Sequence, residues 1–294
     1  MRKFLITLTS FAWCLVATNL KAQPYIDLLN TRYSYSPNTG TANETNVPVK
    51  MQYFNISTNL PIRFKKSGDA ILINPLVESW KIAWPDKNYK KRDLEGFALP
   101  VGFLKNFGHS KFSLLGMFIP RINKEKTASE NNHFFQFGGF LLGSIRLNDR
   151  LSLKAGAYYN QEFFGPFFIP LLGIDWKING KTNLFGTLPN QLVFERKINS
   201  RVYVGGITRF VTNSYRLASQ WSNQEYLRID ENQIGGFADF YLTKKLIANF
   251  EFGHSVARKI KENAHRFEPP TQYDLHPKDN FYMKLALAYR IRFR

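Results

Sequence analysis

The segment 281–293 constrains the fold of this chain more than any other, because apolar and polar side chains alternate along it without a break. All of its odd positions are apolar, whereas its even positions include the cations Lys284, Arg290 and Arg292. Successive side chains of a β-strand point to opposite faces, so the pattern predicts a strand with one wholly apolar face. A strand in a soluble protein usually has about five or six residues, whereas a tilted membrane strand needs about 9 to 11 within the hydrocarbon. The segment therefore predicts a transmembrane strand.

The same alternation recurs upstream, in the segments 135–147, 151–160 and 246–253. Long segments with apolar residues on one face and polar residues on the other are typical of transmembrane β-barrels. A soluble β-sandwich has the same period of two and is the alternative fold.

The connections between these segments favour the barrel. Short polar turns are predicted at 66–69, 108–110, 148–150, 179–180, 199–200 and 243–245. Seven other connections, five of them longer, are predicted at 37–46, 85–93, 123–132, 165–166, 189–190, 213–224 and 258–279. Alternation of short turns with longer loops is typical of outer-membrane barrels. Thirteen connections predict an all-β fold, a single antiparallel transmembrane barrel of about 14 strands; 12 strands are expected if the segment 182–197 is misread.

Residues 1–22 have the layout of a secretory signal peptide, which leaves 23–294 as the barrel domain. Arg2 and Lys3 precede an apolar run from Phe4 to Ala17, and cleavage is expected after Ala22. The run is shorter than the roughly 20 residues that a spanning helix needs. Export of a barrel predicts the bacterial outer membrane, with its lipid as the surrounding partner. The one cysteine, Cys14, lies within this signal, so disulfides and thiolate metal sites are excluded from the exported chain.

The net charge of +18 has more than one interpretation. A basic chain suggests nucleic-acid binding, but the secretory signal argues against such a partner. The candidate residues lining the lumen are Arg146, Lys154, Lys284, Arg290, Arg292 and Glu251. Cations around a pore favour anions. Alternatively, these cations pair with Glu251, Asp239 or Glu162 inside a closed barrel, and the sequence leaves both hypotheses open.

The chain offers little support for catalysis or for a cofactor. A serine–histidine pair on one strand face needs a spacing of two, whereas His254 and Ser255 are adjacent and face opposite sides. His109 and Ser110 are also adjacent and lie in a predicted turn. The five histidines lack metal-ligand spacing, and no glycine-rich phosphate loop is present. We therefore assign no catalytic, metal-binding or cofactor-binding residue.

The segment 163–199 resembles a family of uncharacterised outer-membrane barrel proteins. The matching residues are Gly165, Pro166, Pro170, Gly173, Asp175, Trp176, Phe185, Gly186, Pro189 and Glu195. The resemblance implies a barrel and an outer-membrane address, but no substrate or catalytic residue. The barrel-assembly machinery, an expected partner, usually recognises a last strand that ends in an aromatic residue. Here the aromatic residue Phe293 is followed by Arg294, which departs from that pattern.

Within this segment, 163–176 is apolar on both faces apart from Asp175, and two prolines interrupt its backbone donors. Proline in a sheet belongs at edges, bulges or strand ends. The segment is therefore expected to be a loop packed against the barrel rim or an apolar patch inside the barrel that contacts a lipid-like ligand or a plugging loop.

The function that the sequence favours is a passive channel or transporter for small or anionic solutes. Two alternatives stay open: a closed structural barrel that displays loops, and a barrel enzyme that modifies lipids. The sequence sets no oligomeric state.

Overall fold

The segment 281–293 forms most of the last strand, β18, and its two faces differ as the alternation predicts. Its odd residues are exposed on the outside of the molecule, with Leu285 59% exposed, whereas its even residues are buried inside, with Tyr282 0% exposed. The structure is a computed structural model that describes residues 24–41, 48–84, 90–108, 111–128, 134–218, 224–264, 271–275 and 277–293. The predicted signal peptide and Arg294 lie outside the described residues.

The described chain is made of β-strands in one antiparallel sheet. The strands are β1 (Tyr25–Thr39), β2 (Val49–Thr58), β3 (Leu60–Arg63), β4 (Ala70–Ile73), β5 (Leu76–Trp84), β6 (Lys90–Ala98), β7 (Val101–Asn106), β8 (Phe112–Glu125), β9 (Phe135–Asn148), β10 (Leu151–Glu162), β11 (Gly165–Lys177), β12 (Thr182–Leu188), β13 (Gln191–Lys197), β14 (Val202–Arg216), β15 (Tyr226–Tyr241), β16 (Leu246–Ala264), β17 (Thr271–Asp274) and β18 (Asn280–Arg292). No helix among the described residues is long and apolar enough to span a membrane.

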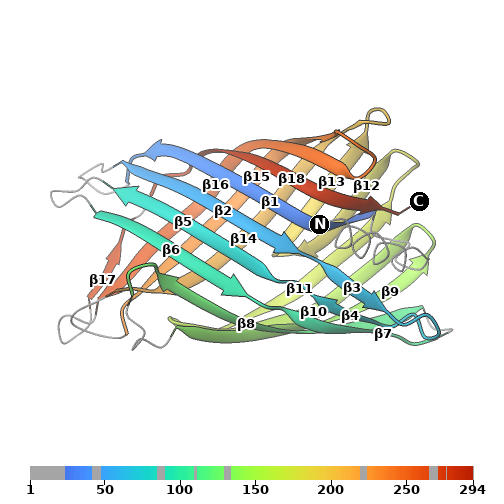
Figure 1. Cartoon of the computed structure of the whole chain (residues 1–294), viewed down its shortest axis with the longest axis horizontal. Helices are drawn as coiled ribbons and strands as arrows, with labels where there is room; N and C mark the ends of the chain where they lie inside the picture. Colours follow the sequence, from blue (N-terminus) through green and yellow to red (C-terminus); the bar gives the residue numbers. More distant parts are fainter. Residues whose placement is uncertain are drawn as a thin grey trace, which may run out of the picture.

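The sheet closes on itself, because β18 pairs with β1 from Tyr25–Arg292 to Tyr35–Met283 (Figure 1). Three wall segments are each interrupted once: β2 continues as β3, β4 as β5, and β6 as β7. Strand β17 pairs only with β16, beyond the wall. Eighteen strands less these three continuations and β17 leave fourteen wall segments in the described chain, which confirms the predicted single antiparallel barrel of 14 strands.

The outer face of the barrel is apolar and its inner face is charged. Exposed apolar side chains recur around the wall, and they include Phe54, Phe103, Phe118, Phe137, Leu141, Phe250 and Leu285. Buried carboxylates and guanidinium groups lie on the alternate positions, as Glu251 and Arg290 show. This distribution is the reverse of that in a soluble protein and is typical of a barrel whose outside contacts hydrocarbon.

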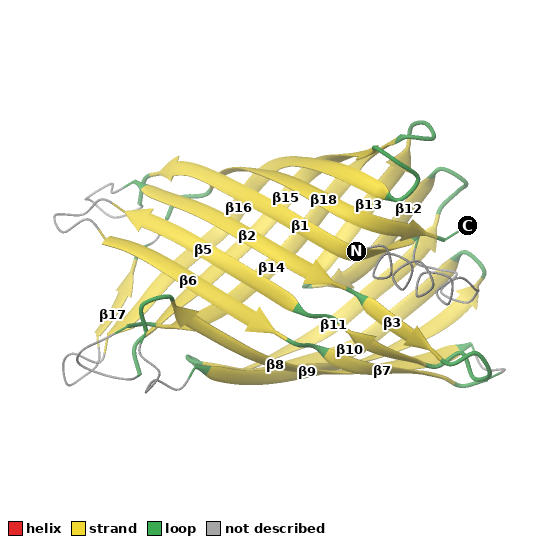
Figure 2. Ribbon diagram, in the orientation of Figure 1, coloured by secondary structure: helices red, strands yellow, loops and turns green. Residues whose placement is uncertain are grey.

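Short turns join the strands at the end of the barrel where β1 begins and β18 ends (Figure 2). Asparagine side chains close three of them: Asn148, Asn179 and Asn199 each accept a hydrogen bond from the backbone N–H two residues later, over 2.8 to 2.9 Å. Such local bonds make asparagine a favoured turn residue. The opposite end carries the longer connections, as the sequence predicts. We call these two ends the turn side and the loop side.

Two of the predicted long loops are partly strand, so the prediction is wrong for 213–216 in the first and for 258–264 and 271–274 in the second. Strand β14 runs to Arg216, and β16 runs to Ala264. Near Ala257, whose φ is +51°, the pairing of β15 with β16 shifts by one residue. Such a bulge moves every later side chain to the opposite face. Arg258, Ile260 and Glu262 therefore point inward, against the parity of the residues before the bulge.

The lumen as the candidate functional site

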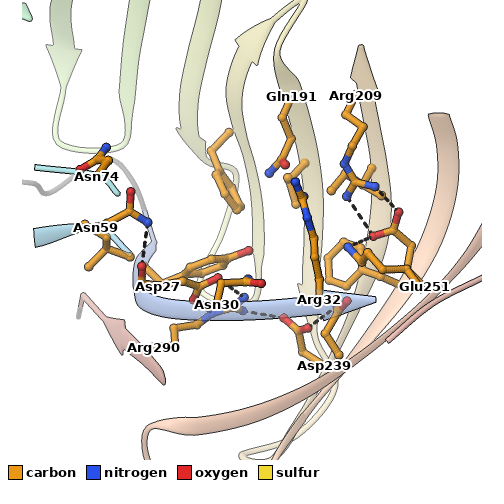
Figure 3. Close-up of a pocket in the computed structure, with 18 of the residues that line it drawn as sticks. Asp27, Asn30, Arg32, Asn59, Asn74, Gln191, Arg209, Asp239, Glu251 and Arg290 are labelled. Atoms are coloured by element: carbon orange, nitrogen blue, oxygen red, sulfur yellow. Dashed lines mark hydrogen bonds and ion pairs between the residues drawn. The ribbon is translucent and has the colours of Figure 1, made fainter. Parts of the chain in front are cut away.

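Three cavities follow one another inside the barrel. The middle cavity, of about 370 Å³, contains Arg32, Arg209 and Glu251 in its wall (Figure 3). A second cavity of about 370 Å³ lies on the turn side and shares Ile26, Pro61 and Leu72 with the middle one. A third, of about 190 Å³, lies toward the loop side and shares Arg32, Arg209 and Lys284 with the middle one. The shared walls make the cavities neighbours along the lumen.

The wall of the middle cavity holds a buried cluster around Glu251 of β16. Arg209 of β14 donates two hydrogen bonds to this carboxylate, at 2.6 and 3.0 Å, and the Tyr282 hydroxyl donates a third at 2.6 Å. Lys284 of β18 forms an ion pair with the same carboxylate. Figure 3 shows Arg209 and Glu251 facing each other, although β15 lies between their two strands in the sheet. The predicted lumen residues Lys284 and Glu251 therefore lie together.

The other predicted cations of β18 also contact acids. Arg290 binds Asp27 at 2.5 and 3.0 Å and Asp239 at 2.5 Å. Arg292 forms two hydrogen bonds with Glu195, at 2.7 and 2.9 Å. Closure of the sheet places Asp27 of β1 beside Arg290, whereas Asp239 of β15 and Glu195 of β13 reach the β18 cations from the inner face of other parts of the wall. The charges of the middle lumen are therefore largely compensated.

The turn-side cavity has more cations in its wall than acids. Arg63, Lys111, Arg146 and Lys154 contribute to its lining, with Asp175 as the acid. Lys154 binds Asp175 at 2.7 Å. Within the described chain, the Arg146 guanidinium forms no ion pair, and its backbone N–H donates to Lys111. The predicted residues Arg146 and Lys154 thus share one cavity, separate from the cluster at Glu251.

A cluster of buried apolar residues closes the loop side of the lumen, and the sequence reasoning missed it. We call it the loop-side cluster; its members are Val49, Met51, Trp80, Ile82, Trp84, Leu94, Tyr215, Leu217, Leu227, Ile229 and Ile260. They come from the inner faces of β2, β5 and β6 on one side and from the ends of β14, β15 and β16 on the other. Leu227 and Ile229 alternate with Arg228 and Asp230, so the sequence indicated a strand with one apolar face. It did not indicate that this apolar face would point into the lumen.

A second cluster surrounds Glu162 at the end of β10; the sequence indicated this acid as an inward partner for cations, but not Arg121, Gln136 and Ser214 as its partners. This buried carboxylate accepts hydrogen bonds from Arg121 at 2.9 Å, from Gln136 at 3.0 Å, and from the backbone N–H of Ser214 at 3.1 Å. The Ser214 hydroxyl donates a further bond at 2.5 Å. Ser214 belongs to β14, so the end of β14 has turned inward against the inner face of β8, β9 and β10.

The first part of the resemblance segment, 163–176, is mainly a wall strand, β11, so the expectation of a rim loop over 163–176 is wrong for residues 165–176. Pro166, Pro170 and Trp176 lie on the outer face, whereas Asp175 points inward to Lys154. Gly165 begins the strand with a φ of +118°, which favours glycine. Glu195 belongs to β13 and binds Arg292, as described above.

His254 and Ser255 point to opposite faces of β16. The His254 ring lies edge-on to Phe281, with ring centroids 5.0 Å apart, on the outer face. The Ser255 hydroxyl donates inward to Glu231. Among the described residues, no three His, Cys, Asp or Glu side chains are arranged to hold a metal ion.

Comparison with protein families gives one match, over residues 18–290, to a family described as "Domain of unknown function (DUF6268)". The chain belongs to this family. No curated protein matches it. The match covers the described barrel as far as Arg290 in its last strand. The predicted membership of an uncharacterised barrel family is confirmed.

Among solved structures, the COG4313 outer membrane channel from Pseudomonas putida F1 is similar, with a TM-score of 0.50 and 7% identity over 94% of this chain and 100% of that chain. The toluene transporter TodX from P. putida has a TM-score of 0.47 and 9% identity over 92% of this chain and 91% of that one. The NanC porin has a TM-score of 0.40 and 7% identity over 90% and 100%. At these identities the likeness shows the fold alone: a 14-strand β-barrel that resembles those of bacterial outer-membrane channels and porins.

Proposed function

We propose that the protein is an outer-membrane channel for small solutes. The observation that supports it is the row of three neighbouring cavities, which runs from the turn side to the loop-side cluster. A barrel with a purely structural role needs no such space, because side chains can fill a narrow lumen completely. The turn-side end of this row of cavities is where the solute enters or leaves the lumen.

The cations of the turn-side cavity give the turn-side end of the lumen a preference for anions. Arg146 is the residue that best reports it, because no carboxylate in the described chain compensates its guanidinium. Cations near a pore raise the local concentration of anions and lower that of cations. Deeper in the lumen, the paired charges at Glu251 and Arg290 give no such bias.

Conductance of the purified protein in a planar lipid bilayer tests this proposal. Steady conductance with a preference for chloride over potassium is expected, and Arg146→Glu is expected to reduce that preference. Arg150→Glu is the matched control, because Arg150 lies in the adjacent turn but contributes nothing to the wall of the cavity. Equal loss of preference in both variants would contradict a role for the turn-side cavity.

The loop-side cluster favours a second candidate function, a closed barrel that displays its loops. Eleven buried apolar residues fill the loop side of the lumen, and water does not cross such a core. If the protein conducts no ions in bilayers and passes no solute into liposomes, this result would support the closed barrel and contradict the channel.

A further inference from the structure

One part of the barrel wall lacks backbone pairing between the strands that flank it. Strand β11 pairs with β12 only from Leu172 to Lys177, and β14 pairs with β13 only as far as Arg209. The hairpin of β12 and β13 is short, with seven residues in each strand. Above this hairpin, residues 165–171 of β11 have no strand partner on this side, and the end of β14 leaves the wall and turns inward, where Arg216 pairs with Lys124 of β8. We call this part of the wall the seam.

The free edge of β11 has few backbone donors to satisfy. The Lys177 N–H donates to the Arg150 carbonyl on the β10 side, so even-numbered residues of β11 direct their N–H groups toward the seam. Two of these residues, Pro166 and Pro170, have no N–H. An unsatisfied donor in hydrocarbon costs several kcal/mol, roughly, and open sheet edges are avoided there for that reason. The two prolines make β11 suited to an unpaired edge.

The β11 side of the seam is apolar on both faces, whereas the β14 side includes the polar residues Asn213 and Ser214. Phe167, Ile169 and Leu171 are on the inner face of β11, in contrast to the charged lumen below. On the outer face, Phe168 and Leu172 are 68% and 67% exposed, more than any other large apolar side chain described. A hollow of about 400 Å³ beside them, on the lipid-facing side of the wall, is lined by Phe118, Phe137, Leu141, Tyr159 and Phe168. Both faces of β11 at the seam, and the outer face of the strands beside it, are therefore apolar.

Side chains hold the loop-side end of the seam closed. Glu162 binds the backbone N–H and the hydroxyl of Ser214, and the Phe163 N–H donates to the same hydroxyl at 3.0 Å. Arg216 lies over the ring of Phe163 at 4.1 Å, and Arg228 lies over the ring of Phe164 at 4.2 Å. A few such contacts separate more readily than a continuous ladder of backbone hydrogen bonds.

We propose that the seam is a lateral gate, through which an apolar solute passes between the lumen and the outer leaflet of the membrane. The proposal rests on the channel function, because a solute must first occupy the lumen. The loop-side cluster obstructs the axial route with apolar side chains and must move aside for ions to pass, whereas the seam offers an apolar solute a separate route through the wall. The occupant is a small apolar solute, because charged groups are few along the seam and no strand occupies it.

A disulfide across the seam tests the gate. We would replace Phe163 and Ser214 by cysteine, because the 3.0 Å contact between the Phe163 nitrogen and Ser214 Oγ makes the two residues neighbours at the loop-side end of the seam. Titration of free thiols after oxidation would verify that the disulfide forms. The natural chain has no cysteine after Cys14, so no other thiol interferes in the barrel. Delivery of the fluorescent dye N-phenyl-1-naphthylamine into liposome membranes and ion conductance would be measured together, before and after oxidation.

Oxidation is expected to stop protein-dependent dye delivery, reduction to restore it, and ion conductance to stay unchanged. Cysteines at Thr31 and Leu287, which already face each other between β1 and β18, provide the control disulfide and should leave delivery unchanged. Unchanged delivery with a complete seam disulfide would overturn the gate but leave the channel intact. Loss of both delivery and conductance would overturn the separate apolar route. A protein that shows neither activity before oxidation would overturn both proposals.

Loosening the seam should have the opposite effect. Glu162→Ala removes the carboxylate that binds Ser214, so the population of the open state should increase. The rate of dye delivery should then rise about tenfold. Glu195→Ala is the matched control: Glu195 is also a buried carboxylate with an arginine partner, but it lies where β13 is fully paired. A rise of equal size in both variants would show general destabilisation instead of opening of the seam.

Discussion

At the scale of single residues, the charges of the lumen are organised as buried pairs and clusters. The alternation in 281–293 was enough to predict that Lys284, Arg290 and Arg292 point inward. Their partners could not be predicted, because they come from strands far away in the sequence: Glu195 is 97 residues from Arg292. Which acid faces which cation depends on strand order and register around the closed barrel, and neither is encoded locally.

The cluster at Glu251 provides a prediction at this scale. Glu251→Gln leaves Arg209 and Lys284 without a compensating charge in a buried site. Removal of one partner of a buried ion pair costs about 3–5 kcal/mol, so the midpoint of urea unfolding in detergent should fall clearly. Glu95→Gln is the control, because its ion pair with Lys124 is exposed and is expected to contribute at most about 1 kcal/mol. Equal shifts in the two variants would contradict the buried cluster.

At the scale of strands and turns, the sequence predicted the regular elements and missed those that change face or leave the wall. The asparagine turns follow from local chemistry, so they were predictable. The inward faces of β14 to β16 were not, because the bulge at Ala257 reverses the parity of β16. The segment 163–176 was recognised as unusual, but only the short hairpin of β12 and β13 explains why its prolines are tolerated.

Two neighbouring glycines of β14 give a prediction for the packing of the strands. A Cβ atom on Gly205 would lie 1.9 Å from the Phe194 carbonyl oxygen and 2.8 Å from the Phe237 ring, whereas one on Gly206 would lie 3.8 Å from its nearest neighbour. Gly205→Ala must therefore displace backbone, which costs about 1–3 kcal/mol, and refolding into detergent should be impaired. Gly206→Ala should refold normally. The reverse order would contradict the close approach at Gly205.

At the scale of the whole molecule, the closed barrel followed from length, alternation and the order of short and long connections. The loop-side cluster did not, because it depends on strands that bend into their own lumen. The result is a barrel with a lipid-facing outside, a compensated charged interior and a closed loop side. The proposed channel function requires that this closure yields or that the wall opens at the seam.

The most direct test of the barrel itself is electrophoresis in detergent of the purified, exported chain, with and without boiling. A closed sheet of fourteen segments resists dodecyl sulfate in the cold, because every wall strand is bonded to neighbours and no long free edge admits detergent. The unheated chain is expected to migrate as a compact species and to shift to the mobility of the unfolded chain on boiling. Identical migration of the two samples would contradict the closed transmembrane barrel.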